Sequence, residues 1–140
     1  MLSRLISRAS AVVLAAGGVA FLFVPDVIVP GLMPGYPASG LWFVQLLAAA
    51  LLALACLNWL NRLVLLGGPY ARPPVATNTV WYFVATTVLL KAATSREPPG
   101  AFWILAVPVV LFSAVYGWLY FRGPFESDLA AYARAQPPST

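Results

Sequence analysis

The stretch LNWLNRLVLLGGPYARPPVATN, residues 57–78, is a polar interruption in an otherwise apolar chain. It combines three asparagines and two arginines with a Gly-Gly pair and three prolines. Glycine and proline favour turns, and proline disrupts helix interiors. The stretch therefore predicts a hairpin connection between two helices, and it raises the question whether its asparagines and arginines do more than make a turn.

The sequence on either side has the composition of a membrane protein. The chain of 140 residues is 61% hydrophobic and 9% charged, whereas soluble domains have roughly 25% charged residues. Residues 27–61, 73–90 and 98–121 contain no charge, and each gap is near or above the ~18 residues that cross hydrocarbon. We therefore expect a single transmembrane domain over residues 1–140.

Hydropathy and turn residues predict an all-α fold, an integral membrane bundle of four transmembrane helices. The expected spans are 5–24, 41–61, 79–93 and 101–121, followed by a juxtamembrane helix over 127–135. Helices are expected because the alternating pattern of a barrel strand is missing from the sequence. Pro73 and Pro74 are expected to delay the third helix, so that Thr77 or Asn78 becomes its N-cap.

Positive residues in short loops predict the orientation in a bacterial inner membrane. Six of them fall on one side and two, Lys91 and Arg96, on the other; the six are Arg4, Arg8, Arg62, Arg72, Arg122 and Arg134. Both termini are therefore expected in the cytoplasm. The N-terminal run could also open a secretory signal peptide, although bulky Phe21 and Phe23 follow where small residues belong.

Tryptophan positions support this map, because indole rings prefer the membrane–water interface. All five fall at expected interfaces, as anchors: Trp42, Trp59, Trp81, Trp103 and Trp118. Trp42 and Trp59 would bracket the second span about 26 Å apart at 1.5 Å per residue.

Small residues predict how the spans pack, since lipid gives helices little hydrophobic reason to associate. Ala49, Ala53 and Cys56 share one face of the second span. The loop before that span, residues 24–40, contains four prolines and is not expected to form a regular helix. It would lie on the membrane surface, cap the bundle or, if protein shields its backbone, re-enter the membrane.

Five polar residues in and after the hairpin exceed what a turn needs, and they are candidates for contact with a partner's backbone or a lipid headgroup. They are Asn58, Asn61, Arg62, Arg72 and Asn78. The first three have the spacing of one helical face.

Asp26 and Lys91 form a second candidate, an intramembrane polar pair near the expected outer end. Lys91 could instead extend its ammonium to the headgroups along its apolar stem. Gln45 is a further polar group at membrane depth.

The sequence predicts neither catalysis nor a metal or other cofactor. Histidine is absent, which removes the commonest metal ligand and general base. Cys56 is the single cysteine, and no nucleophile has a base nearby in the sequence pattern. The positive residues are scattered over membrane boundaries, so nucleic acid is not an expected partner.

The hairpin motif, LNW followed by GG-x-Y-x-RP and a later asparagine, resembles a family of small bacterial four-helix membrane proteins with no known activity. The resemblance covers the second and third spans and implies the same topology. Its motif positions correspond here to Asn58, Trp59, Gly67, Gly68, Tyr70, Arg72, Pro73 and Asn78. Pro69 is an addition to the motif.

The function expected from these features is that of a non-catalytic accessory or structural subunit of a larger membrane complex, for example a respiratory or photosynthetic one. Its partners would be the bilayer and other membrane subunits, or further copies of the chain. The alternative is a small oligomeric transporter or lipid-binding carrier that uses Lys91, Asp26 and the cytoplasmic asparagine and arginine cluster.

Overall fold

The computed structural model describes residues 2–95 and 98–135, and all regular structure in this part of the chain is helical. The elements are α1 (Leu2–Phe23), α2 (Pro25–Leu32), the 3₁₀ turn η1 (Ala38–Gly40), α3 (Leu41–Leu60), the 3₁₀ turn η2 (Pro69–Ala71), α4 (Arg72–Ser95), α5 (Gly100–Arg122) and α6 (Glu126–Ala135). The all-α prediction is confirmed.

Among the described residues, three helical segments are long and apolar enough to cross a membrane: Leu2–Phe23, Ala38–Leu60 and Gly100–Arg122. These three segments indicate a multi-pass membrane protein. The predicted third span corresponds to α4, which has 24 residues but more polar side chains, and it does not reach the same apolarity.

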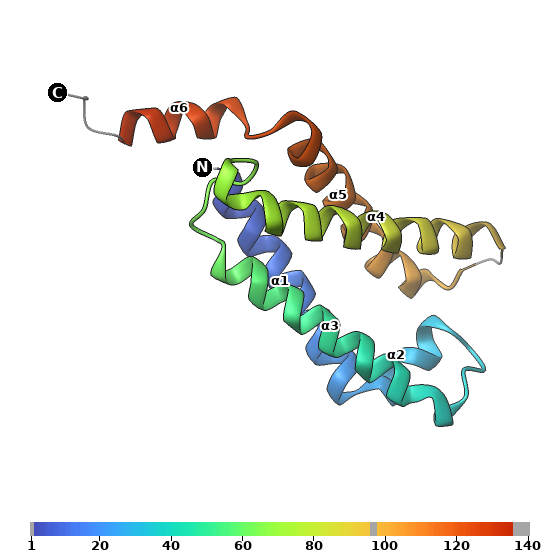
Figure 1. The fold of residues 1–140 in the computed structure, drawn as a ribbon. Helices are drawn as coiled ribbons and strands as arrows, with labels where there is room; N and C mark the ends of the chain where they lie inside the picture. The colour runs from blue at the N-terminus through green and yellow to red at the C-terminus, as the bar shows by residue number, and fades with distance from the viewer. Residues whose placement is uncertain (1, 96–97, 136–140) are drawn as a thin grey trace.

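The long helices form two hairpins (Figure 1). Helix α1 packs along α3, and α4 packs along α5. Helices α3 and α4 diverge from the loop between them. At the end of the molecule opposite this loop, α2 contacts α5. The start of α1, the end of α3, the start of α4 and the end of α5 lie together, and α6 leads away from this shared end.

Helix α4 begins seven residues earlier than predicted, because Pro73 and Pro74 lie in its first turn instead of preceding it. Proline is tolerated there since first-turn N–H groups have no intrahelical partner. The predicted N-cap role of Thr77 or Asn78 is therefore wrong. Trp81 lies nine residues into the helix, about 14 Å from its start, instead of marking its beginning.

The first loop contains a helix, which corrects the prediction that its prolines prevent one. Pro25 occupies the first position of α2, where its fixed φ is favourable. Pro30 lies inside the helix and removes the donor for a single carbonyl, that of Asp26. Buried Val29 packs with Phe21 and the residues around it, so α2 caps the α1–α3 hairpin.

The packing face of α3 is rotated from the predicted one. The alanines and cysteine of the predicted seam, Ala49, Ala53 and Cys56, are exposed. Ala48 and Ala55 are buried instead. Both sets have helical spacing, so periodicity did not distinguish them. The close approach occurs at Gly18, where an added Cβ would lie 3.1 Å from the carbonyl oxygen of Ala48.

Because of this contact, Gly18 has no room for a side chain, whereas its neighbour Gly17 has. We expect Gly18→Ala to destabilise the protein by about 1 to 2 kcal/mol. Its Cβ would lie 2.8 Å from Cγ of Leu52, so α1 and α3 must separate. The control is Gly17→Ala, whose Cβ would meet only Leu51 Cδ1, at 3.8 Å; it should be neutral or stabilising through helix propensity. Reversible unfolding in mixed micelles measures both, and equal effects would contradict the close approach.

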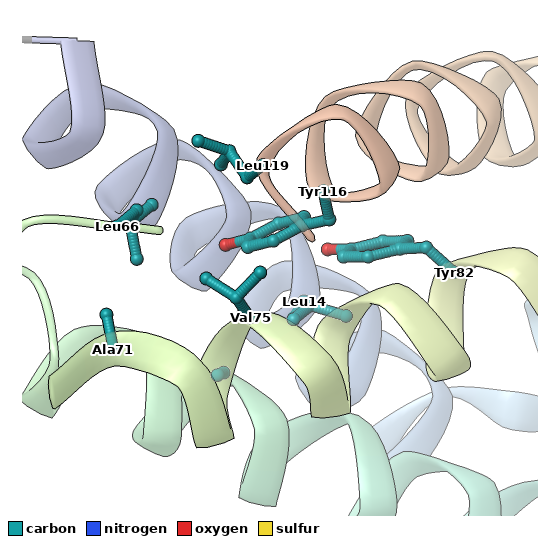
Figure 2. Packing of buried hydrophobic residues seen from close by; sticks show 8 residues of the cluster. Leu14, Leu66, Ala71, Val75, Tyr82, Tyr116 and Leu119 are labelled. Atoms are coloured by element: carbon teal, nitrogen blue, oxygen red, sulfur yellow. The ribbon is translucent and has the colours of Figure 1, made fainter. Parts of the chain in front are cut away.

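The larger buried apolar cluster lies at the shared end and joins all four long helices. Its members are Leu14, Ala55, Leu66, Ala71, Val75, Tyr82, Tyr116 and Leu119. Figure 2 shows the rings of Tyr82 and Tyr116 side by side with their hydroxyls pointing the same way. The ring centroids lie 5.6 Å apart at an interplanar angle of 13°, a stacked pair that joins α4 to α5.

Candidate functional site

Next to this cluster lies a neutral hydrogen-bonded group that we call the polar seam: Ser7 and Ser10 of α1, Asn58 of α3, and Asn78 and Tyr82 of α4. Each of these residues is at most 1% exposed. Burial of polar groups is tolerated only when they are hydrogen-bonded, so the partners of each group decide what the seam can do.

The two asparagines bind each other reciprocally. Asn58 Nδ2 donates to Asn78 Oδ1 at 2.9 Å, and Asn78 Nδ2 donates to Asn58 Oδ1 at 2.6 Å. The second amide hydrogens go to Ser10 Oγ, at 2.8 Å, and to the Pro74 carbonyl, at 2.7 Å. All four amide N–H groups therefore have partners, and α3 is joined to α4.

The serines extend the seam to α1. Ser7 Oγ donates to the Asn58 carbonyl at 2.7 Å, and Ser10 Oγ shares a hydrogen bond of 2.8 Å with the Tyr82 hydroxyl. Beside the seam, Thr79 Oγ1 donates to the Tyr116 carbonyl of α5 at 3.0 Å. No member of the seam carries a charge, so the arrangement fixes helices against one another and contains no acid–base pair.

The positions of Asn58 and Asn78 correct the prediction that they contact a headgroup or a partner. Both side chains are buried, and their amide N–H groups are bound by each other and by Ser10 and Pro74. The expected shared face of Asn58, Asn61 and Arg62 does not form either, since α3 ends at Leu60 and Asn61 is its C-cap.

The other candidates of this set lie nearer the surface. The Asn61 amide donates to the Leu57 carbonyl at 2.8 Å. Arg62 folds back, donating to the Trp59 carbonyl at 2.7 Å, with its guanidinium 4.6 Å from the Trp59 ring centroid. Arg72 is exposed and lines an open pocket beside Arg122.

The predicted pair of Asp26 and Lys91 occupies two separate elements. Asp26 is exposed in the first turn of α2, and Lys91 is exposed near the end of α4. Their pairing stays a prediction. Gln45 Nε2 donates to the Leu22 carbonyl at 3.2 Å, which joins α3 to α1.

Four of the five tryptophans have the exposure that an interfacial anchor needs, namely Trp42 (61%), Trp59 (48%), Trp103 (51%) and Trp118 (53%). Trp81 differs, because it is half-buried against the core cluster. Their depth in a membrane stays a prediction.

A second polar contact joins α6 to the start of α1. The Asp128 carboxylate of α6 accepts hydrogen bonds from the backbone N–H groups of Leu2, at 2.8 Å, and Ser3, at 2.6 Å, and from the Ser3 hydroxyl. It therefore caps the N-terminus of α1, where first-turn N–H groups lack intrahelical partners and the helix dipole favours an anion. Desolvation opposes ionisation of Asp128, but these hydrogen bonds from Ser3 and Leu2 outweigh it and lower its pKa.

This cap predicts a pH-dependent docking of α6. Because the pKa of docked Asp128 is lowered, the stabilisation is complete above the ordinary aspartate pKa of about 4 and is lost as pH falls through the lower docked value. Asp128→Asn should weaken docking at pH 7 by about 1 to 2 kcal/mol. Hydrogen exchange at the Leu2 and Ser3 amides measures this, with Glu126→Gln as the control, and unchanged protection in Asp128→Asn would contradict the cap.

Sequence reasoning missed Ser7, Ser10, Tyr82 and Asp128. A signal for the serines was present, because Ser3, Ser7 and Ser10 have the spacing i, i+4, i+7 of one helical face. Within residues 2–95 and 98–135, no three acidic, cysteine or histidine side chains form a group that could hold a metal.

Comparison with known protein families, with curated proteins and with solved structures finds no match to this chain. The family resemblance of the hairpin motif stays an expectation.

Proposed function

We propose that the chain is a four-span membrane protein that acts as a non-catalytic accessory subunit of a larger membrane complex, with both termini in the cytoplasm. The observation that carries the proposal is the small buried share of its most apolar helix. Only 17% of the most apolar 18-residue stretch of Ala38–Leu60 is buried within the chain. Most of that surface is left for lipid or for another membrane protein.

The exposed face of α3 supports a protein partner as well as lipid. It presents the small residues Ala49, Ala53 and Cys56 in a stripe. Small residues let helices approach closely within a membrane, and Ala49, Ala53 and Cys56 are not covered by any helix of the part of the chain that the structure describes. The predicted seam would then be an interface with a second protein.

Packing supports the fourth span and the orientation. Helix α4 packs along α5, so a membrane that α5 crosses would enclose much of α4 too. Its Asn78 and Thr79 have partners inside the bundle, which lowers the cost of placing them in lipid. Asp128 of α6 contacts the start of α1, which supports an even number of spans with α6 and the start of α1 on one side of the membrane.

The test uses Cys56, the single cysteine of the chain, which is exposed on the stripe. A photo-crosslinker attached to Cys56 in native membranes should give one protein adduct of constant mass, and the same protein should co-purify in fixed stoichiometry in mild detergent. Cys56→Ala combined with Val12→Cys, an exposed position on α1, is the control. An adduct of twice the chain's own mass, or lipid adducts alone, would reject the heteromeric subunit.

A further inference from the structure

An open pocket of about 700 Å³ lies at the shared end, between the start of α4 and the end of α5. Arg72 and Arg122 both line it, together with apolar residues such as Val75 and Leu119. Its size falls within the range of small-ligand sites, which is roughly 300 to 1,000 Å³. A smaller pocket of about 300 Å³, which Leu89 and Trp103 line, has apolar lining residues alone.

The two arginines are 50 positions apart in the sequence, and a close backbone contact brings them to one pocket. Gly67 and Gly123 also line it. A Cβ on Gly67 would lie 2.7 Å from the carbonyl carbon of Gly123. The loop between α3 and α4 therefore contacts the connection between α5 and α6. This contact brings the first residue of α4 and the last residue of α5 to the same pocket.

The charge of the pocket is unbalanced. No acidic residue lines it, and within residues 2–95 and 98–135 neither guanidinium is bonded to a carboxylate. Both arginines line the pocket, so its lining carries two positive charges and favours an anion. Guanidinium matches the geometry of phosphate through paired N–H groups.

The position of the pocket indicates the source of the phosphate. Arg122 lies over the ring of Trp118, 5.4 Å from its centroid, and Trp118 is 53% exposed. Exposed tryptophan and arginine at the end of a span are typical of the headgroup level. The same pocket has apolar walls formed by Leu119, Phe121 and Val75, which suit the glycerol and upper acyl carbons of a lipid.

We propose that this pocket binds the headgroup phosphate of an anionic phospholipid of the cytoplasmic leaflet, held between Arg72 and Arg122. The inference rests on the membrane placement of α4 and α5 in the proposed function, and it does not depend on a partner protein.

The experiment measures binding of phosphatidylglycerol to the purified full-length chain in nanodiscs and by native mass spectrometry, at salt high enough to screen surface charge. Wild type should retain about one phosphatidylglycerol molecule per chain through delipidation with a zwitterionic detergent. Arg72→Gln with Arg122→Gln should weaken its binding by roughly tenfold or more, because each change removes a charge-assisted hydrogen bond to the phosphate, which salt screens less than surface attraction. Lysine at both positions should restore part of the affinity, because charge is kept and the paired geometry is lost.

The matched control removes the same two charges outside the pocket, with Arg62→Gln and Arg134→Gln. It should change the affinity less than threefold. An equal loss in both double variants would overturn the proposal in favour of general surface attraction. Displacement of the lipid by millimolar inorganic phosphate would also overturn it, by identifying a site for free phosphate.

The lipid site and the subunit proposal can be rejected independently, because the lipid-binding assay uses the purified chain without a partner protein. Retained lipid with no co-purifying partner would reject the subunit and keep the lipid site. A constant partner without arginine-dependent lipid binding would reject the lipid site and keep the subunit.

Discussion

Gly67→Ala is expected to destabilise the protein by about 4 kcal/mol, enough to prevent folding in many conditions. Gly67 has φ = 86°, in the left-handed region that a side chain disfavours. An added Cβ would also lie 2.6 Å from the Pro124 nitrogen and 2.7 Å from the Gly123 carbonyl carbon. These are backbone atoms, so no side-chain rotation relieves the contact.

The matched variant is Gly123→Ala, which separates strain from collision. Gly123 has φ = 82° and ψ = −162°, a region used almost solely by glycine, but an added Cβ there meets nothing within 4 Å. It should cost about 2 kcal/mol. Unfolding of both variants in mixed micelles gives the comparison. If Gly67→Ala cost no more than Gly123→Ala, the close contact between the two loops would be wrong.

The second large effect is expected at the asparagine pair. Asn58→Leu or Asn78→Leu alone should cost about 2 kcal/mol, because each leaves the amide of the other residue buried without its partner. The double variant should cost clearly less than the sum, since it removes both amides together. Interhelical hydrogen bonds in membranes contribute roughly 0.6 kcal/mol on average and at most about 1.7. The interaction energy between Asn58 and Asn78 from this double-mutant cycle should fall near the upper part of that range.

The control for this double-mutant cycle of Asn58 and Asn78 is Asn61→Leu. The Asn61 side-chain amide donates to the Leu57 carbonyl of its own helix end, and it joins no two helices, so its replacement should cost less than about 0.5 kcal/mol. Strict additivity of the two single variants would show that Asn58 and Asn78 do not interact. A neutral Asn58→Leu would reject the polar seam as a stabilising feature.

Local patterns predicted the extents of several helices closely. The second span was expected at 41–61 and α3 covers Leu41–Leu60; the fourth was expected at 101–121 and α5 covers Gly100–Arg122. The juxtamembrane helix was expected at 127–135 and begins one residue earlier. The errors occurred at prolines, in α2 and at the start of α4, because a proline that disrupts a helix interior is tolerated in the first turn.

The candidate contacts were harder to predict. The three asparagines were correctly singled out, but two of them, Asn58 and Asn78, form hydrogen bonds between α3 and α4 inside the chain. An amide side chain looks the same in sequence whether it faces a headgroup or another asparagine. The choice between Ala48 and Ala49 as the packing face likewise depends on helix rotation, which periodicity leaves open.

By itself, then, the amino-acid sequence determined the helical class, the apolar runs and most helix ends, because hydropathy and turn chemistry act over a few neighbouring residues. Tertiary structure alone decided that Asn58 meets Asn78, that Asp128 caps α1 and that Arg72 shares a pocket with Arg122. Each of these pairs is separated by many residues, and its meeting depends on how whole helices are rotated and placed against one another.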